Sequence, residues 1–194
     1  MPDVSRRHPS SERAILDATL ALLRSGGLPA LTIEGIAAEA GVGKQTIYRW
    51  WPSKGAVALD ALLQEVRPAT GVPDTGDLRA DLAAVLEQVV ALLADPDLGR
   101  HLVACLAEAS RDPELAARFS DRVFTPMRSA HRQRLEQAGQ EGVVRLGLDL
   151  DVVLDMAFGA VWFRALTRPQ DLERGLGQSI AKLLLDGAAS SAAS

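Results

Sequence analysis

The sequence contains one cysteine, few aromatic residues and no apolar run long enough to cross a membrane. With Cys105 alone, the chain can form neither an internal disulfide nor a thiolate metal cluster. The longest apolar run, residues 156–163, is far shorter than the roughly 20 residues of a membrane-spanning helix. No apolar stretch of signal-peptide length follows Arg6 and Arg7. We therefore expect a cytoplasmic protein with no membrane partner.

The overall composition is that of a globular protein. Hydrophobic residues make up 47% and charged residues 24% of the 194 residues, which excludes a disordered or collagen-like chain and leaves enough apolar mass for a core. Aromatic residues account for only 4%. Alternating runs of Val, Ile and Thr are nearly absent, whereas apolar residues recur three and four positions apart. This pattern predicts an all-α fold.

A cluster of helix-breaking residues predicts a boundary between two domains. Residues 67–76 contain two prolines and two glycines, which cannot continue a helix. The charge also changes there: residues 1–58 hold seven basic and five acidic residues, and the remainder holds 14 and 20. We therefore expect two domains with different partners, residues 1–66 and residues 77–188.

Start and stop signals divide both domains into helices. In the first domain, a helix begins at Ser10 or Ser11 and stops at 25–27, and three more cover residues 33–40, 44–51 and 54–66. In the second domain, the predicted helices are 78–94, 98–110, 113–138 with a bend at Pro126, 150–167, and one from Pro169 or Asp171 to about Gly187. Thr32, Ser53, Asp77 and Asp149 are the expected N-caps.

The second and third predicted helices have the spacing of a helix-turn-helix. Only residues 42–43 separate Gly41, which ends one helix, from Lys44, which begins the next. A short turn with glycine holds two short helices at a steep angle. Ile47 and Trp51 fall on one side of the third helix, so we expect them to pack against the second.

The opposite side of the third helix carries side chains suited to base edges in a DNA major groove. Arg49 can donate two hydrogen bonds to guanine, Gln45 can pair with adenine, and the methyl group of Thr46 can contact a thymine methyl. Long or hydroxylated side chains at the margins, and a helix N-terminus, can reach phosphates. The predicted phosphate contacts are Lys44, Tyr48 and Lys54 through their side chains, and Thr32 and Ser53 at helix N-termini.

Residues 32–54 resemble the DNA-binding core of the TetR family of transcriptional regulators. The resemblance rests on the Ile-Ala-Ala-Glu-Ala-Gly-Val block at residues 36–42, on Tyr48, on the aromatic Trp51 and on Pro-Ser-Lys at residues 52–54. It implies a homodimeric repressor that binds a two-fold symmetric operator in double-stranded DNA. It also implies release of the operator when an unknown small-molecule effector occupies the C-terminal domain.

Two positions differ from the family pattern. Gly43 stands where the family often has a serine cap, which weakens the start of the third helix. Trp50 stands where a small or polar residue usually precedes a phenylalanine. Trp50 therefore either contacts DNA or supports the core.

The apolar helices near the C-terminus predict the dimer interface. Residues 152–166 are apolar nearly all round, and such a helix needs burial on two sides. The last helix carries a leucine-rich stripe, so these two helices can pair with their symmetry mates as a four-helix bundle. The predicted interface residues are Val153, Ala157, Val161, Leu176, Ile180, Leu183 and Leu184.

Apolar residues of the second domain are candidates for a ligand pocket, because such pockets are mostly apolar with few polar groups. Each can equally belong to the core or the dimer seam, and a cysteine within an apolar helix is commonly a small buried residue. The candidates are His101, Cys105, Phe124, Met127, Phe158 and Trp162.

The sequence shows no catalytic constellation, cofactor motif or metal site. Gly-Val-Gly-Lys at residues 41–44 departs from a P-loop at Ala38 and Gln45, and no strand precedes it. His8 and His131 lack metal-ligand spacing with other His or Cys residues. We therefore expect a DNA-binding regulator rather than an enzyme. The alternative is a helical ligand-carrying or protein-interaction module that does not read DNA.

Overall fold

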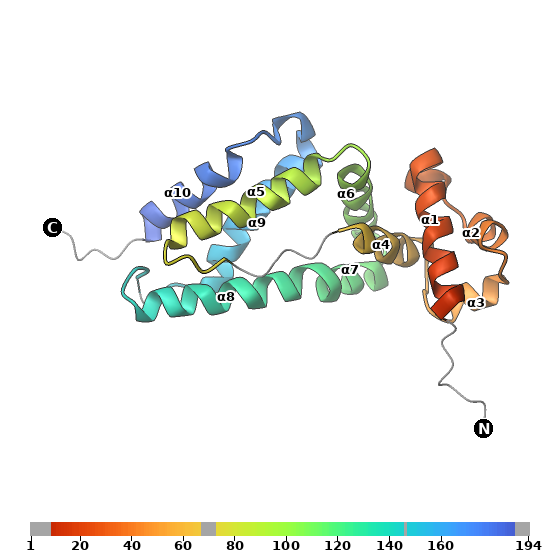
Figure 1. Ribbon diagram of the computed structural model, residues 1–194, viewed down its shortest axis with the longest axis horizontal. Coiled ribbons are helices and arrows are strands. Elements are labelled where there is room, and N and C mark those ends of the chain that lie inside the picture. Colours follow the sequence, from red (N-terminus) through yellow and green to blue (C-terminus); the bar gives the residue numbers. More distant parts are fainter. Residues whose placement is uncertain (1–8, 67–72, 146, 189–194) are drawn as a thin grey trace, which may run out of the picture. The chain divides into compact units, whose positions relative to one another are not determined.

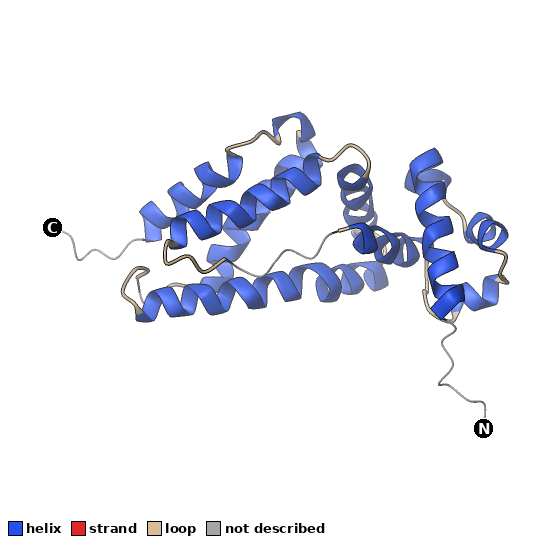
Figure 2. Cartoon of the chain, viewed as in Figure 1, coloured by secondary structure: helices blue, strands red, loops and turns tan. Residues whose placement is uncertain are grey.

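The computed structural model describes residues 9–66, 73–145 and 147–188, and within these ranges it contains helices and no strand (Figure 2). The predicted all-α fold is confirmed. The elements in Figure 1 are α1 (Pro9–Ala30), α2 (Ile33–Ala40), α3 (Lys44–Tyr48), α4 (Lys54–Glu65), α5 (Leu78–Ala94), α6 (Leu98–Ala109), α7 (Pro113–Phe119), the π-helical η1 (Ser120–Phe124), α8 (Thr125–Gln140), α9 (Leu150–Thr167), the 3-10 turn η2 (Pro169–Asp171) and α10 (Leu176–Ala188).

The chain divides into two compact units, and the first is discontinuous in sequence. It comprises Met1–Val66 and Ala104–Phe119, and the second comprises Arg67–Val103 and Ser120–Ser194. Helix α7 therefore belongs with α1–α4, although it follows them by nearly 50 residues in the chain. The expected domains, residues 1–66 and 77–188, place Ala104–Phe119 in the second domain, whereas in the structure this segment packs with the first unit.

Helices α1, α2 and α4 form the core of the first unit. Ile15 and Leu23 on α1, Ile36 on α2 and Leu59 on α4 are completely buried. Each such side chain contributes about 1.5–3 kcal/mol when removed from water. The helix-stop signal near the end of α1 acts as a kink, because Gly27 has a φ of 70° and interrupts a helix that otherwise continues to residue 30.

In the second unit, α10 packs along α5, and α8 packs on α9 (Figure 1). Gly177 permits the close approach of α10 to α5, because a Cβ at this position would lie 2.6 Å from the backbone nitrogen of Glu87. Gly177 therefore brings two helices of the same chain into close contact. Asp77 and Asp149 accept hydrogen bonds from the first backbone N–H groups of α5 and α9, which confirms both predicted N-caps.

The third helix is shorter than predicted, since α3 ends at Tyr48 rather than at Trp51. The backbone N–H groups of Trp50 and Trp51 both donate to the carbonyl of Ile47 at 2.9 Å, which closes the helix in a turn. Pro52 disfavours helical backbone at the residue before it, so the helix does not continue into α4.

Two later helix boundaries also differ from the sequence-based expectation. The predicted helix 113–138 is interrupted by η1, immediately before Pro126. Pro126 has no N–H for the preceding turn and its ring crowds that turn, so the backbone widens there. The last helix begins only at Leu176, because Gly175 has a φ of 94°, which a right-handed helix does not contain.

Candidate nucleic-acid interface

The turn between α2 and α3 is fixed by backbone geometry. Gly41 is left-handed, with a φ of 66°. The N–H of Gly41 donates to Ala38 at 3.3 Å and the N–H of Val42 donates to Ala37 at 3.0 Å, which satisfies the last carbonyls of α2. At the other end of α2, the hydroxyl of Thr32 accepts from the backbone of Gly35 at 3.0 Å, as its predicted capping role requires. The helix-turn-helix is therefore held by its own main chain.

One face of α3 and the turn after it is buried, as predicted. Ile47 is completely buried and Trp51 is 2% exposed. The indole N–H of Trp51 donates to Oδ2 of Asp60 on α4 at 2.9 Å. A hydrogen bond to a buried carboxylate contributes about 1.5–3 kcal/mol. The bond to Asp60 therefore holds Trp51, in the turn after α3, against α4.

Asp60 also joins α4 to α7, and sequence reasoning did not find this residue. The guanidinium of Arg118 donates through Nε to Oδ1 of Asp60 at 3.0 Å and through Nη2 to Oδ2, and the bond to Asp60 raises the pKa of Arg118. Both carboxylate oxygens therefore have partners. The available signal was an isolated charge, because Asp60 is the only charged residue in the apolar stretch 55–63.

Two further contacts hold α7 against the start of α4. The hydroxyl of Ser53, which caps α4, donates to Oδ2 of Asp112 at 2.9 Å. Leu115 packs on Gly55, where a Cβ would lie 2.7 Å from the leucine side chain. Helix α7 is thus part of the support of the helix-turn-helix.

The opposite side of α3 is open to solvent. Gln45 and Arg49 are exposed, Thr46 is half-buried and Tyr48 is 54% exposed. Arg49 lies over the ring of Trp50, with 5.3 Å between the guanidinium carbon and the ring centroid. The residues predicted to read bases therefore share one surface.

Trp50 lies between the core and this surface. It is half-buried, and its ring meets that of Trp51 edge to face at a centroid distance of 5.6 Å. Its other ring contact is the cation–π contact with Arg49. The ring of Trp50 therefore lies between the buried Trp51 and the guanidinium of Arg49.

The two predicted phosphate-binding lysines both have partners within the first unit. Nζ of Lys44 lies 3.0 Å from Oε1 of Glu34, and this hydrogen bond raises the pKa of Lys44 and lowers that of Glu34. Both side chains are more than half exposed, so the pair is easily exchanged for a phosphate. Nζ of Lys54 is half-buried and donates to the carbonyl of Leu28 at 3.2 Å.

Comparisons with known proteins agree with this geometry. Residues 15–61 match the family model described as bacterial regulatory proteins, tetR family, and residues 72–184 match the tetracyclin repressor-like C-terminal domain. The second match alone covers more than half of the chain. The chain belongs to the TetR family.

Individual relatives of this TetR-family chain cover most of its length. YdeS, an HTH-type transcriptional regulator of Bacillus subtilis, is 32% identical over 82% of this chain and 80% of its own. Rv1556 of Mycobacterium tuberculosis is 31% identical over 80% and 76%. The crystal structure of the TetR-family regulator SCO0332 superposes with a TM-score of 0.75 and 34% identity, covering 93% of this chain and all of the other. The protein is a DNA-binding transcriptional regulator.

The candidate ligand residues of the TetR C-terminal domain fall into two groups. Phe158 and Trp162 on α9 are buried, and Phe124 and Met127 opposite them are half-buried. Phe124 and Trp162 meet edge to face, with 5.7 Å between ring centroids. Phe124 and Trp162 are thus brought together by η1 and α9.

The other two candidates, His101 and Cys105, lie on α6 and are buried. Burial raises the pKa of the Cys105 thiol to about 12, so it stays protonated and unreactive near neutral pH. Among the residues that the structure describes, no three His, Cys, Asp or Glu side chains are placed to hold a metal ion. No helix in these same ranges has the length and apolar character to span a membrane.

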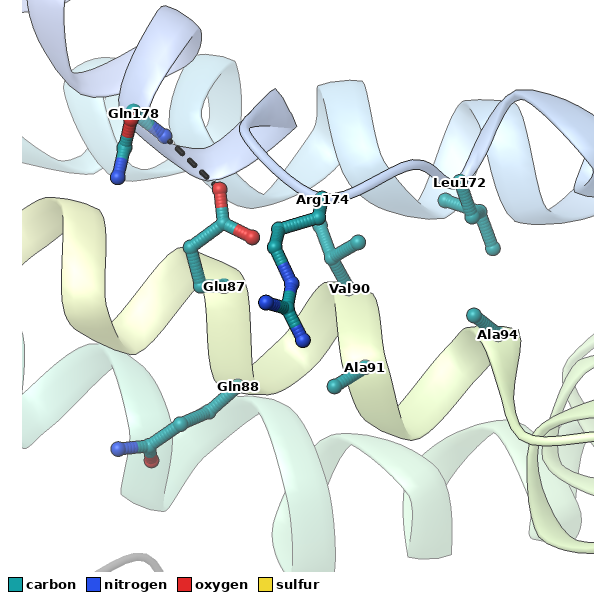
Figure 3. A pocket seen from close by; sticks show the side chains of 8 residues that line it. All are labelled: Glu87, Gln88, Val90, Ala91, Ala94, Leu172, Arg174 and Gln178. Carbon is teal, nitrogen blue, oxygen red and sulfur yellow. Dashed lines mark hydrogen bonds between the residues drawn. The ribbon is translucent and has the colours of Figure 1, made fainter.

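Two open surface grooves follow α5 and α10. The first has a volume of about 520 Å³, and Figure 3 shows Arg174 extending over it beside Glu87, whose carboxylate accepts from the backbone N–H of Gln178 at 3.2 Å. The second, of about 490 Å³, continues toward Asp77. Neither groove is lined by any of the six candidate ligand residues.

Most of the residues predicted for the dimer interface are buried within their own unit. Ala157 is 1% exposed and Val161 is completely buried, while Leu176 and Ile180 are each 8% exposed. These side chains have almost no surface left for a second chain. Among the predicted residues, Val153 and Leu184 are half-buried and Leu183 is 75% exposed.

A different apolar stripe on α9 faces solvent. Val152, Met156, Phe163 and Leu166 are between 45% and 59% exposed. Their spacing of four, seven and three positions places them on one face of the helix. The prediction that α9 is apolar on two sides therefore holds, but the outward side carries these four residues.

Proposed function

We propose that this regulator is a ligand-responsive homodimeric repressor of a two-fold symmetric operator. The observation that supports this most strongly is the division of the α3 segment into two faces. Ile47 and Trp51 are buried, whereas Gln45 and Arg49 are exposed. Arg49, Gln45 and Thr46 would contact base edges in the major groove.

The phosphate contacts would come from residues around α3. Tyr48 and Lys44 are exposed beside the base-reading residues. Lys54 would reach a phosphate by exchanging its hydrogen bond to the Leu28 carbonyl. Thr32 would contribute at the start of α2, where backbone N–H groups and the positive end of the helix dipole favour an anion.

A dimer is required to read both halves of such an operator, because two recognition helices must lie about 34–36 Å apart to enter successive major grooves. We propose that the outward stripe of α9, together with Leu183 on α10, forms the dimer interface. Contiguous exposed apolar residues on a folded chain commonly mark such contacts. This assignment replaces the residues that are buried in the protomer.

An effector bound in the C-terminal domain would favour a state of the dimer that fits the operator less well. Coupling of this kind typically changes affinity by about 1–3 kcal/mol. The protein would act in the cytoplasm, where a bacterial operator is found. No reaction is proposed, since no paired acid and base accompany the binding residues.

The decisive experiment is a gel shift with the DNA that flanks the gene. We expect a sequence-dependent shift that weakens with salt. Phe163→Glu is expected to give a monomer in sedimentation analysis and to lose tight operator binding, whereas the exposed control Arg174→Ala should retain both. A dimer without any sequence-dependent shift would favour the ligand-carrying or protein-interaction module instead.

A further inference from the structure

His131 on α8 is a buried side chain with incomplete hydrogen bonding. It is 9% exposed, and its Nδ1 lies 2.6 Å from the carbonyl oxygen of Met127. Its Nε2 has no hydrogen-bond partner among the residues that the structure describes. Buried polar atoms nearly always have a partner, so an exception calls for a functional explanation.

The neighbour of Nδ1 determines what Nε2 can do. A carbonyl oxygen only accepts hydrogen bonds, so Nδ1 carries the hydrogen and donates to Met127. Burial lowers the pKa of His131 and outweighs the opposite effect of this hydrogen bond, which keeps the ring neutral near neutral pH. Nε2 of the neutral ring is therefore an acceptor that requires a donor.

The surroundings of His131 are aromatic. Its ring meets that of Phe158 edge to face, with 5.1 Å between centroids, and Phe124 meets Trp162 in the same way at 5.7 Å. We call these two ring pairs the aromatic row; each pair joins η1 or α8 to α9. A buried water needs two to four polar partners, and the rings of this row offer Nε2 an apolar environment.

This row is also accessible at one end. Phe124 and Met127 are half-buried, in contrast to the buried Phe158. Small displacements of their side chains would open a path between α8 and α9 toward His131. An apolar enclosure with one polar anchor is typical of small-molecule sites.

We propose that the effector is a neutral, mainly apolar molecule that carries a hydroxyl or N–H group and donates a hydrogen bond from it to Nε2 of His131. This inference rests on the proposed function, because it specifies the chemistry of the effector. A carboxylate has only acceptors and an ether has no donor, so neither satisfies Nε2. A phenol satisfies both the aromatic row and the acceptor.

The test compares phenol with anisole, in which the same ring lacks the donor, and with benzoate. Binding is followed on the full-length protein by ¹H–¹⁵N correlation spectra of the histidine rings, with His131 assigned from the His131→Gln variant. We expect the free protein to show the Nδ1–H form, and phenol to shift the Nε2 resonance. We expect phenol to bind at least about fivefold more tightly than anisole, because an unsatisfied buried acceptor is costly. Benzoate should bind more weakly than phenol.

Two variants test the assignment to His131. In His131→Phe, phenol and anisole should bind equally, whereas His131→Gln retains an acceptor and should retain part of the preference. Arg174→Ala, a change at an exposed residue outside the candidate ligand residues, should leave the preference unchanged. If His131→Phe does not fold, the ring spectra of the unmodified protein still decide the tautomer and the contact.

The proposal is overturned if phenol does not move the Nε2 resonance, if phenol and anisole bind equally to the unmodified protein, or if Nε2 carries the hydrogen. Operator binding is measured on the same preparations without probe. If the unmodified protein does not bind its operator, the proposed function is contradicted. A normal operator shift with no phenol contact at His131 would contradict only the inference about the effector.

Discussion

Asp60 in the first unit and His131 in the second are both 9% exposed, but only the first has complete hydrogen bonding. Both oxygens of Asp60 accept from Trp51 or Arg118. His131 uses Nδ1 alone. A complete buried network specifies one geometry, whereas an incomplete one retains the capacity to bind. Asp60 thus fixes one geometry in the first unit, whereas His131 in the second unit leaves one acceptor available for a donor.

Not every buried polar side chain of the second unit is incompletely bonded. Asp81, which is 2% exposed, accepts from both the backbone N–H and the hydroxyl of Thr75, the latter at 2.7 Å. It also lies 3.7 Å from Nη2 of Arg134. The contrast between Asp60 and His131 therefore does not extend to every buried polar group of the second unit.

The largest expected effect comes from breaking the complete network. Asp60→Ala should lower the free energy of unfolding by about 3 kcal/mol, the low end of the range for breaking a buried ion pair. The low end applies because the side chain of Arg118 is 27% exposed and can regain water. Urea denaturation measures this loss.

A double-mutant cycle would show how much of that loss belongs to the pair. Adding Arg118→Met to Asp60→Ala should cost less than the sum of the two single changes, because the unpaired cation is then absent. Trp51→Phe, which removes the indole donor and also reduces the volume of a buried ring, should cost at least about 1–2 kcal/mol. Strict additivity of Asp60→Ala and Arg118→Met would mean that the ion pair contributes no coupling energy.

A smaller effect is expected when the exposed side of α3 is changed without touching Asp60. Arg49→Ala should weaken operator binding by about 1–3 kcal/mol and relax base preference at one position, with little change in stability. The fluorescence anisotropy of labelled operator variants measures both quantities. Arg174→Ala is the control, since it removes an exposed arginine from the second unit. Unchanged base preference would remove Arg49 from base recognition.

The sequence was sufficient to predict the local parts of this molecule. The all-α fold and the α2–α3 turn follow from short-range signals such as Gly41 and the cap Thr32. The return of α7 to α4 could not be predicted, because Asp60 and Arg118 are 58 positions apart and neither belongs to a periodic pattern. An isolated charge in an apolar helix signals only that some partner exists.

The proposed dimer face shows a second limit of sequence reasoning. Helix α9 is apolar nearly all round, so its sequence does not reveal which side faces the core. Burial distinguishes the inward Val161 from the outward Phe163, two positions away. In the sequence, His131 has no metal-ligand spacing and no other visible signal, because its pairing with Phe158 depends on the packing of α8 against α9.

The incomplete bonding of His131 should also appear in the pH dependence of stability. Burial lowers the pKa of His131 below the 6.5 of an unfolded chain, so the unfolded state binds more protons as the pH falls below about 6.5. Stability should therefore decrease on the acid side of that value, by at most about 1.4 kcal/mol per pH unit for one proton. Urea denaturation between pH 5 and 7 measures the slope. His131→Gln should flatten it, and an identical slope in that variant would assign the proton to another group.

The smallest expected change in the free energy of unfolding concerns the N-caps of the first unit, where complete and incomplete hydrogen bonding can also be compared. Thr32 and Ser53 cap α2 and α4 with side-chain oxygens, whereas Gly43 offers α3 none. Gly43 has a φ of −77° and a ψ of 145°, which any residue adopts, and an added Cβ would meet no atom within 4 Å. Gly43→Ser should therefore raise the free energy of unfolding by about 0.5 kcal/mol, through the cap and a less flexible unfolded chain.

Gly43→Ala separates the two contributions, because it restricts the unfolded chain without supplying an oxygen. Serine should exceed alanine by about 0.5–1 kcal/mol if the hydroxyl caps α3. Equal stability of the two variants would show that the N–H groups at the start of α3 gain nothing from a cap. Since these groups lie beside the residues proposed to read bases, a capped α3 with unchanged operator affinity would also show that the helix is already ordered before it meets DNA.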